Sequence, residues 1–222
     1  MPRVTGLFIT FEGTEGGGKS TQIQVLAKRL RELGRTVRVL REPGGTPIGE
    51  EIRHTLKHSE ANHAMIPEAE LLLMNASRAQ LVREVIRPAL AAGEVVLCDR
   101  FYDSTTAYQG YGRQLDLDAV RRVIDFAVGA TRPHLTLLFQ VPVAVSEERR
   151  RHRNAQASTE GSVAPRRDRM EEADRAFFER VEAGFRAIAE SEPRRVRVID
   201  ATQSIPAVSE AVWRLVSPLM SA

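Results

Sequence analysis

The chain contains 222 residues, of which 42% are hydrophobic and 27% are charged, and its formal net charge is +3. These fractions are ordinary for a globular protein and exclude a fibrous or disordered chain, while the length fits one α/β domain spanning 1–222. No apolar run approaches the roughly 20 residues of a bilayer span, and the first residues do not form a secretory signal, so we expect a cytoplasmic protein without a membrane partner.

Short apolar runs rich in β-branched residues alternate with longer segments of helical periodicity. The predicted strands are residues 7–11, 37–40, 95–98, 135–141 and 196–199. The predicted helices are residues 19–33, 68–91, 118–128, 170–189 and 205–216. Strands that alternate with helices predict a five-stranded parallel sheet flanked by helices on both faces. The single cysteine, Cys98, excludes an internal disulfide and is expected to be buried in its strand.

A glycine-rich motif, G-x-x-x-x-G-K-S, follows the first predicted strand at residues 13–20. Glycines let the backbone curl so that N–H groups point at phosphate oxygens, and the following helix adds the positive end of its dipole. Lys19 can reach the β- and γ-phosphates, and the Ser20 hydroxyl can join a Mg²⁺ shell. The motif predicts a P-loop NTPase fold with an ATP or GTP site. The residues assigned to nucleotide binding are Gly13, Thr14, Glu15, Gly16, Gly17, Gly18, Lys19, Ser20 and Thr21.

A second element of a P-loop site should be an acidic residue at the end of a buried strand. Asp99 stands there, directly after the predicted strand 95–98, and Arg100 follows it. We expect Asp99 to hold Mg²⁺ together with Ser20, directly or through water, and Arg100 to face the phosphates. The alternative for Asp99 is a simple helix cap.

The P-loop alone does not distinguish a GTPase, a motor ATPase, a metabolite kinase and a nucleotide kinase. The Asn-Lys-x-Asp motif that reads guanine in GTPases is absent. Two arginine-rich stretches, at 149–153 and 166–169, flank a polar segment at 154–165. Arginine suits phosphate oxygens, so the whole stretch can form a lid over an active site. A solvated helix face and a tolerated surface insertion remain the alternatives.

Three longer strings make the sequence similar to a known family. They are Phe-Glu-Gly-Thr-Glu-Gly at 11–16, Arg-Glu-Pro-Gly-Gly-Thr-Pro-Ile-Gly at 41–49 and Asp-Arg-Phe-Tyr-Asp-Ser-Thr-Thr-Ala-Tyr-Gln-Gly at 99–110. With shorter stretches at 81–90, 168–171 and 199–203, they resemble bacterial thymidylate kinases in the family's order over nearly the whole chain. The resemblance implies a P-loop nucleoside monophosphate kinase that uses ATP and Mg²⁺ to convert dTMP to dTDP for dTTP biosynthesis.

The resemblance also implies roles for residues around the sugar and the acceptor phosphate. Glu15 matches the acidic residue that contacts the sugar 3′-hydroxyl, and Tyr108 would pack against the sugar and exclude a ribose 2′-hydroxyl. Arg53 and Arg100 match residues that hold the acceptor phosphate. The residues expected to line the same pocket are Arg41 and Glu42.

Around the base, Arg78 matches the arginine that donates to a thymine carbonyl, while Thr105 and Gln109 match polar residues at the base edge. Met74 stands where bacterial relatives commonly carry an aromatic that stacks on the thymine ring. Methionine is polarizable enough to cover a π-face. Without the resemblance, Arg78 would be interpreted as a surface helix residue and Tyr108 as a core aromatic.

The lid indicates a subtype of the family. Some members place a catalytic arginine in the P-loop, where this chain has Gly16, so the chain resembles the group that supplies arginines from the lid, predicted over about 149–169. Arg149 and Arg153 match those positions and, four residues apart, share one helical face. The residues assigned to catalysis are Lys19, Asp99, Arg100, Arg149 and Arg153.

Two other functions remain open. One is a kinase for another nucleotide or small metabolite, which would differ only in the acceptor pocket. The other is a nucleic-acid-binding ATPase, but the net charge is small and no aromatic residues interleave the arginines at 149–153, so no nucleic-acid partner is expected. The resemblance suggests a homodimer, with the helices near 68–92 and 118–128 as contact faces.

Overall fold

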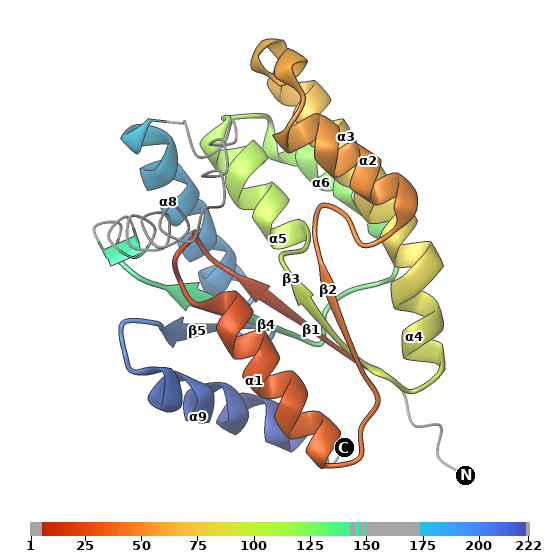
Figure 1. The fold of residues 1–222 in the computed structure, drawn as a ribbon. Helices are drawn as coiled ribbons and strands as arrows, with labels where there is room; N and C mark the ends of the chain where they lie inside the picture. Colours follow the sequence, from red (N-terminus) through yellow and green to blue (C-terminus); the bar gives the residue numbers. More distant parts are fainter. Residues whose placement is uncertain (1–5, 143–144, 147–148, 150–173, 221–222) are drawn as a thin grey trace, which may run out of the picture.

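The computed structural model describes residues 6–142, 145–146, 149 and 174–220. Within them, five parallel strands form one sheet in the order β2-β3-β1-β4-β5 (Figure 1). The strands are β1 (Leu7–Glu12), β2 (Val37–Arg41), β3 (Val95–Asp99), β4 (Leu135–Gln140) and β5 (Val196–Asp200). The predicted five-stranded α/β fold is confirmed.

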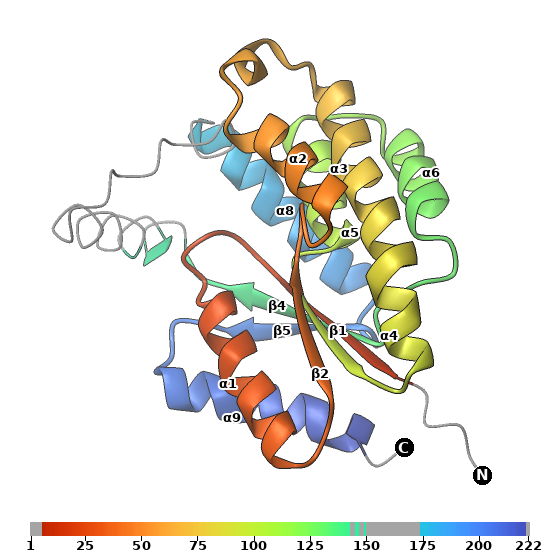
Figure 2. The ribbon, with the colours of Figure 1, turned by 45° about the vertical axis from the view of Figure 1, so that its right-hand side comes forward.

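Helices cover both faces of the sheet (Figures 1 and 2). The α-helices are α1 (Lys19–Glu32), α2 (Pro47–Lys57), α3 (Pro67–Leu81), α4 (Arg87–Ala91), α5 (Tyr102–Thr105), α6 (Leu117–Val128), α8 (Arg175–Ser191) and α9 (Ile205–Val216). The shorter turns are η1 (Glu60–Ala64), η2 (Val82–Ile86), η3 (Thr106–Gly112) and η4 (Ser217–Met220), of which η2 and η3 are π-helical. Helices α1 and α9 lie on one face, and α3, α4, α5, α6 and α8 lie on the other. None of the helices in the described ranges is long and apolar enough to cross a membrane.

Alternation along β1 shows why the sheet is buried on both sides. Ile9 and Phe11 pack toward α1 and α9, while Phe8 between them packs toward α3, α4 and α6. All six residues of β1 are buried, because side chains of successive strand residues point to opposite faces and both faces carry helices. Cys98 lies in the second of these cores and is buried, as expected.

Three helical predictions need correction. The predicted helix 68–91 is divided into α3, η2 and α4, because Pro88 has no N–H to donate and a π-helical turn precedes it. Helix α2 was not predicted, although Thr46 caps it by accepting from the Gly49 N–H at 3.0 Å and proline follows at its first position. The helical segment from α5 through η3 was also missed, since its small and polar residues show no amphipathic period.

Several boundaries also differ, most of them by one or two residues. Strand β4 ends at Gln140, one residue before the predicted end. Helix α8 begins at Arg175, whereas the predicted helix began at 170, and residues 170–173 lie outside the described residues. The loops that follow β1, β2 and β3 leave the sheet at its carboxyl edge, and the three longer strings that resemble the kinase family begin there.

Candidate active site

The loop between β1 and α1 curls around the ammonium group of Lys19. Its Nζ donates to the carbonyl oxygens of Gly13 at 2.9 Å and Thr14 at 2.8 Å. Gly13, Gly16 and Gly18 have φ of +121°, +78° and +81°, and a Cβ on Gly13 would stand 2.2 Å from the Phe139 carbonyl oxygen. A positive φ favours glycine at all three positions, and at Gly13 the Phe139 carbonyl also leaves no room for a side chain. The binding of phosphate by this loop stays a prediction.

The Lys19 side chain is almost fully buried, and this changes its acidity. Burial, with the nearby Arg100 cation as the next cause, lowers the pKa of Lys19 from about 10.5 to about 7. Asp99, Glu12 and Glu15 act in the opposite direction. Because this pKa lies close to neutral pH, a negative charge added beside Lys19 would strongly change the fraction of lysine that is protonated.

Ser20 and Asp99 meet at the carboxyl edge of the sheet. The Ser20 hydroxyl, at the start of α1, donates to Asp99 Oδ2 at the end of β3 across 2.9 Å. Mg²⁺ binds proteins through one or two oxygen ligands and takes the rest from phosphates and water. A hydroxyl and a carboxylate side by side next to a phosphate cradle fit that requirement.

Arg100 adopts φ of 67°, which is uncommon for a residue with a side chain. Its guanidinium donates to Ser104 Oγ at 3.1 Å and to the Tyr108 hydroxyl at 3.4 Å, and it lies 5.1 Å above the Tyr108 ring. Burial opposes its charge, but Tyr108, Asp99, Glu12 and Glu15 together raise its pKa above the usual value. The cation is thus fixed between the P-loop and α5.

Glu12, at the end of β1, supports the turn that follows Asp99. Its carboxylate accepts from the Phe101 N–H at 2.7 Å and from the Ser104 hydroxyl. Burial, followed by the charge of Asp103, raises the pKa of Glu12 to about 8. This acid was not singled out in the sequence analysis, because it continues an apolar strand.

Arg78 is the largest fully buried side chain, with 2% of its surface exposed. Its Nε and Nη2 pair with Glu42 Oε2 at 2.8 and 2.7 Å, and Nη1 donates to Asn75 Oδ1 and Thr105 Oγ1, both at 2.9 Å. Nη2 also donates to the Phe101 carbonyl at 3.2 Å. Four hydrogen bonds and the ion pair with Glu42 thus surround the guanidinium. The interpretation of Arg78 as a surface residue is wrong, and a thymine carbonyl would have to compete with these acceptors for it.

The network has two further consequences. Asn75 orients Arg78 and donates from Nδ2 to the Leu71 carbonyl at 2.8 Å. Burial raises the pKa of Glu42 to about 7 against the opposing effect of Arg78, and Glu42 Oε1 is buried without a recorded hydrogen bond among the described residues. A buried, incompletely satisfied carboxylate therefore depends on Arg78.

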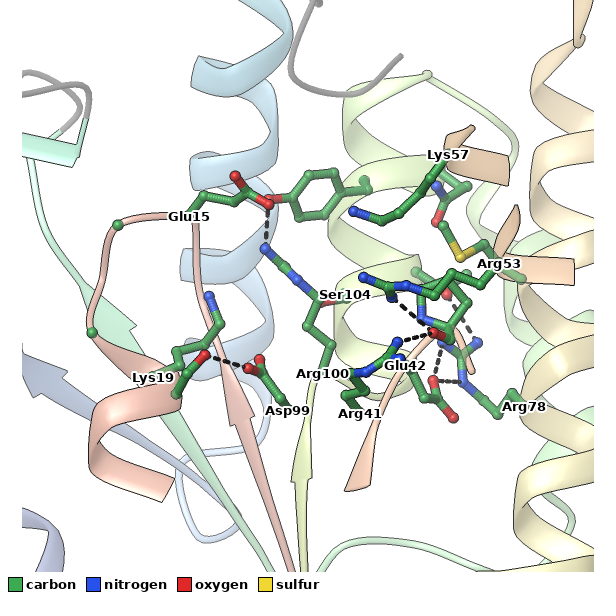
Figure 3. A pocket seen from close by; sticks show the side chains of 18 of the residues that line it. Glu15, Lys19, Arg41, Glu42, Arg53, Lys57, Arg78, Asp99, Arg100 and Ser104 are labelled. Atoms are coloured by element: carbon green, nitrogen blue, oxygen red, sulfur yellow. Dashed lines mark hydrogen bonds and ion pairs between the residues drawn. The ribbon is translucent and has the colours of Figure 1, made fainter. Parts of the chain in front are cut away.

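One cavity of about 520 Å³ joins these groups (Figure 3). The predicted residues that line it are Glu15, Gly16, Gly18, Lys19, Ser20, Thr21, Arg41, Glu42, Arg53, Met74, Arg78, Asp99, Arg100, Thr105, Tyr108, Gln109 and Arg149. Gly13, Thr14 and Gly17 do not line it. The first two hold Lys19 through their carbonyls, and a Cβ on Gly17 would stand 3.4 Å from the Phe139 Cβ.

On the α2 side of the cavity, Arg53 donates to the Pro43 carbonyl at 2.8 Å, and Arg41 pairs with Glu50 at 3.0 Å. Tyr108 lines the cavity and also packs edge-on against Phe177 and Phe185 in the core. Its contact with a sugar stays a prediction.

Four lining residues were missed by the sequence reasoning: Pro43, Lys57, Ser104 and Phe178. Lys57 follows Arg53 by four residues, so recognising α2 as a helix would have placed both on one face. Phe178 comes from the first turn of α8, and its position depends on packing between distant parts of the chain.

Of the predicted lid, Arg149 lies in the described part of the chain. Its Nη1 donates to the Ala201 carbonyl at 2.9 Å and to the Gly16 carbonyl at 3.4 Å, which brings it to the P-loop. Arg153, and the predicted lid beyond Arg149, lie outside the described residues.

The chain matches the family model described as "Thymidylate kinase" over residues 11–212. The chain belongs to the thymidylate kinase family. It is 50% identical over 207 residues to a thymidylate kinase of Geobacter sulfurreducens, covering 93% of this chain and 94% of that one. It is 47% identical over 206 residues to the thymidylate kinase of Syntrophotalea carbinolica, with 93% of both chains covered.

A solved structure agrees with this assignment. The fold superposes on the crystal structure of thymidylate kinase from Ehrlichia chaffeensis with a TM-score of 0.73 and 31% sequence identity, covering 96% of this chain and 99% of that one. The family indicated by the sequence strings is thereby confirmed. The roles of individual residues stay predictions at this point.

Proposed function

We propose that this chain transfers the γ-phosphoryl group of ATP to dTMP, giving ADP and dTDP. The observation that carries the proposal is the single cavity that joins the P-loop to the acceptor residues on α2, α3 and η3. Transfer between two nucleotides requires both to lie in one enclosed space with their phosphates in line. In such a cavity the phosphates of the donor and of the acceptor would both lie near Arg100.

On the donor side, the P-loop amides and Lys19 would bind the β- and γ-phosphates. Ser20 and Asp99 would hold Mg²⁺, which supplies charge neutralisation on the transferred group when it is bound. Arg149, next to the Gly16 carbonyl, would add a second cation to the P-loop, which has no arginine of its own. Arg153 and a lid over about 149–169 of a single 1–222 domain stay predictions from the sequence.

On the acceptor side, Arg53 and Arg100 would hold the dTMP phosphate. The attacking group is an oxygen of that phosphate, which is already anionic, so the site needs positioning more than a strong general base. Arg41 and Glu42 would complete the pocket wall, with Glu42 acting through Arg78.

Around the nucleoside, Glu15 would accept from the 3′-hydroxyl, and the buried Tyr108 ring would leave no room for a 2′-hydroxyl. Met74 would cover the face of the base, while Thr105 and Gln109 would contact its edge. Arg78 would contact a base carbonyl only by exchanging a neutral acceptor such as Thr105 Oγ1 for it.

A homodimer is part of the same proposal. Helices α3 and α6 pack against each other through Leu71, Val120 and Ile124, yet each also carries a large apolar side chain on its outer side. Leu72 is 58% exposed and Phe126 is 86% exposed. Such apolar groups on two adjoining helices are typical of a protein contact surface. The cytoplasmic location stays a prediction.

A panel of acceptors tests the function. The purified chain with MgATP is offered dTMP, dUMP, dCMP, AMP and UMP in turn, and ADP is measured by a coupled assay. We expect dTMP to give the highest kcat/KM. A preference for dCMP, AMP or UMP would overturn the proposal, and ADP release without any acceptor would indicate a simple ATPase.

A further inference from the structure

The side-chain amide of Gln109 lies at the acceptor end of the cavity, with 1% of the residue exposed. Its Nε2 donates to Glu70 Oε1 at 2.8 Å. Glu70 comes from the first turn of α3 and is itself 2% exposed. Gln109 and Glu70 therefore form a buried contact between η3 and α3 that the sequence strings did not indicate.

Arg113 holds the Glu70 carboxylate from the other side. Its Nη2 lies 3.1 Å from Oε2 and its Nε lies 3.3 Å from Oε1. The Arg113 guanidinium is in turn placed 4.7 Å above the Phe177 ring of α8. The carboxylate is thus oriented by two donors of one rigid fork, and Oε1 is presented to Gln109.

A carboxylate can only accept hydrogen bonds, whereas the two ends of an amide differ: its nitrogen donates and its oxygen accepts. Turning the Gln109 amide over would place its oxygen against Glu70 Oε1, two buried acceptors in contact. Glu70 therefore fixes which end of the amide faces it. Gln109 Oε1 is left for the cavity, and the described residues record no hydrogen bond to it.

The orientation matters because pyrimidines differ at N3. Thymine and uracil carry an N3–H that donates, while N3 of cytosine has a lone pair and accepts. We propose that Glu70 is a positioning residue that locks the Gln109 amide so that its oxygen accepts from the N3–H of the acceptor base and rejects cytosine. The proposal rests on the proposed function, and it assigns base selectivity to an acid that does not itself touch the substrate.

Other groups at this end of the cavity cannot replace that lock. Met74 covers a face of the base and is indifferent to its edge. Arg78 already donates four hydrogen bonds within the protein, and the Thr105 hydroxyl, which accepts one of them, rotates to suit either base. The buried amide of Gln109 is the group whose direction is fixed by a charge.

The test is Glu70→Gln, which keeps the shape of the side chain but lets it meet either end of the Gln109 amide. The readout is the ratio of kcat/KM for dTMP to that for dCMP. We expect this ratio to fall at least tenfold, with a higher KM for dTMP and a higher kcat/KM for dCMP. A ratio within twofold of the unmodified enzyme would overturn the proposal.

Glu94→Gln is the matched control. Glu94 also pairs with an arginine, Arg38 at 2.7 Å, but it stands directly before β3, at the end of the strand opposite Asp99. The same substitution there should leave the ratio unchanged. A similar fall in both variants would show a general loss of structure, and would contradict a specific role for Glu70.

Gln109→Met supplies a second arm that does not depend on the stability of the Glu70 variant. It should lower the dTMP to dCMP ratio at least tenfold by itself, and adding Glu70→Gln should then change the ratio no further. A ratio preserved in Gln109→Met, or a further fall in the double variant, would contradict the proposal.

The same measurements separate this inference from the proposed function on which it rests. If the unmodified enzyme does not phosphorylate dTMP, the proposed function fails. If it does and the ratios stay constant among the variants, this inference alone fails.

Discussion

Arg78 is a cation almost completely removed from water, and the protein compensates with four hydrogen bonds and an ion pair. Its partners come from the residue after β2, from α3, from the end of α5 and from the backbone between β3 and α5. The energetic value of such a group is asymmetric. An intact buried pair adds little net stability, but removal of one partner leaves the other charge buried and unpaired.

Replacement of Arg78 should therefore be costly. Arg78→Met should lower the free energy of unfolding by about 3–5 kcal/mol, since Glu42 would stay buried without its cation. Arg175→Met is the comparison, because Arg175 pairs with Glu179 on the surface and exposed pairs contribute at most about 1 kcal/mol. Denaturant titration of the two variants measures both losses. Equal losses would show that the buried contacts of Arg78 contribute no more to stability than an exposed ion pair does.

Lys19 gives a prediction about protons. Its pKa of about 7 in the folded chain lies below the ordinary 10.5, so between these values the unfolded chain holds more protons and this residue's contribution to stability rises with pH. Bound ATP adds negative charge and favours the ammonium. Binding at pH 8 should therefore take up a proton, and binding at pH 6 should not, as calorimetry in buffers of different ionisation enthalpy can measure. Lys19→Arg, which stays charged, should abolish the uptake at pH 8; uptake that persists would assign it to another group.

The site was predictable from the sequence where its residues are contiguous. The P-loop and the Asp99-Arg100 pair are local strings whose chemistry requires their spacing. Glu12 and Glu70 were not found, because an isolated acid in an apolar segment shows no local sign of its partners. Those partners lie 89 and 39 residues away in the chain and meet only through the fold.

At the scale of elements, the strands were predicted well because each is short, apolar and bounded by turns. The sequence predicted that the strands are parallel, but it did not predict their order in the sheet. That order depends on how the helices that connect the strands pack on the two faces. The segment from α5 through η3 was missed for a physical reason: it is buried on nearly all sides, so no polar face marks its period.

The contact of η3 with α8 is unusually close. A Cβ on Gly184 would lie 2.8 Å from Cγ and Cδ2 of Tyr111, and a Cβ on Gly112 would lie 2.6 Å from Phe177 Cε2. Glycine on each side thus lets the two helical segments approach at backbone distance. This close approach also positions residues that line the cavity, namely Tyr108 and Gln109 on η3 and Phe178 on α8.

Gly184→Ala should therefore destabilise the protein, although the helix propensity of alanine is more favourable than that of glycine by about 1 kcal/mol. Forcing a methyl group against the Tyr111 ring should cost about 1–3 kcal/mol and outweigh that gain. Denaturant unfolding measures the net change. In a Tyr111→Leu background the smaller neighbour should make Gly184→Ala neutral or stabilising, and a loss that is the same in both backgrounds would contradict the steric account.

At the scale of the molecule, the functional groups gather at one edge of one sheet. The cavity opens where β1, β2 and β3 end, so its lining residues on the P-loop and on α2 and α3 are positioned by the same sheet. The outer sides of α3 and α6 face away from the sheet. An enzyme that pairs through them would keep its cavity separate from the contact.

Phe126 is the most exposed large apolar side chain among the described residues, and it tests that arrangement. Phe126→Glu should place a charge in the contact and weaken self-association at least tenfold, since a buried unpaired carboxylate is costly. Val198→Glu is the control, because Val198 is 51% exposed on the edge strand β5, away from α3 and α6. Sedimentation over a range of concentrations measures both variants. A dimer that survives Phe126→Glu unchanged, or that Val198→Glu disrupts instead, would place the contact elsewhere on the molecule.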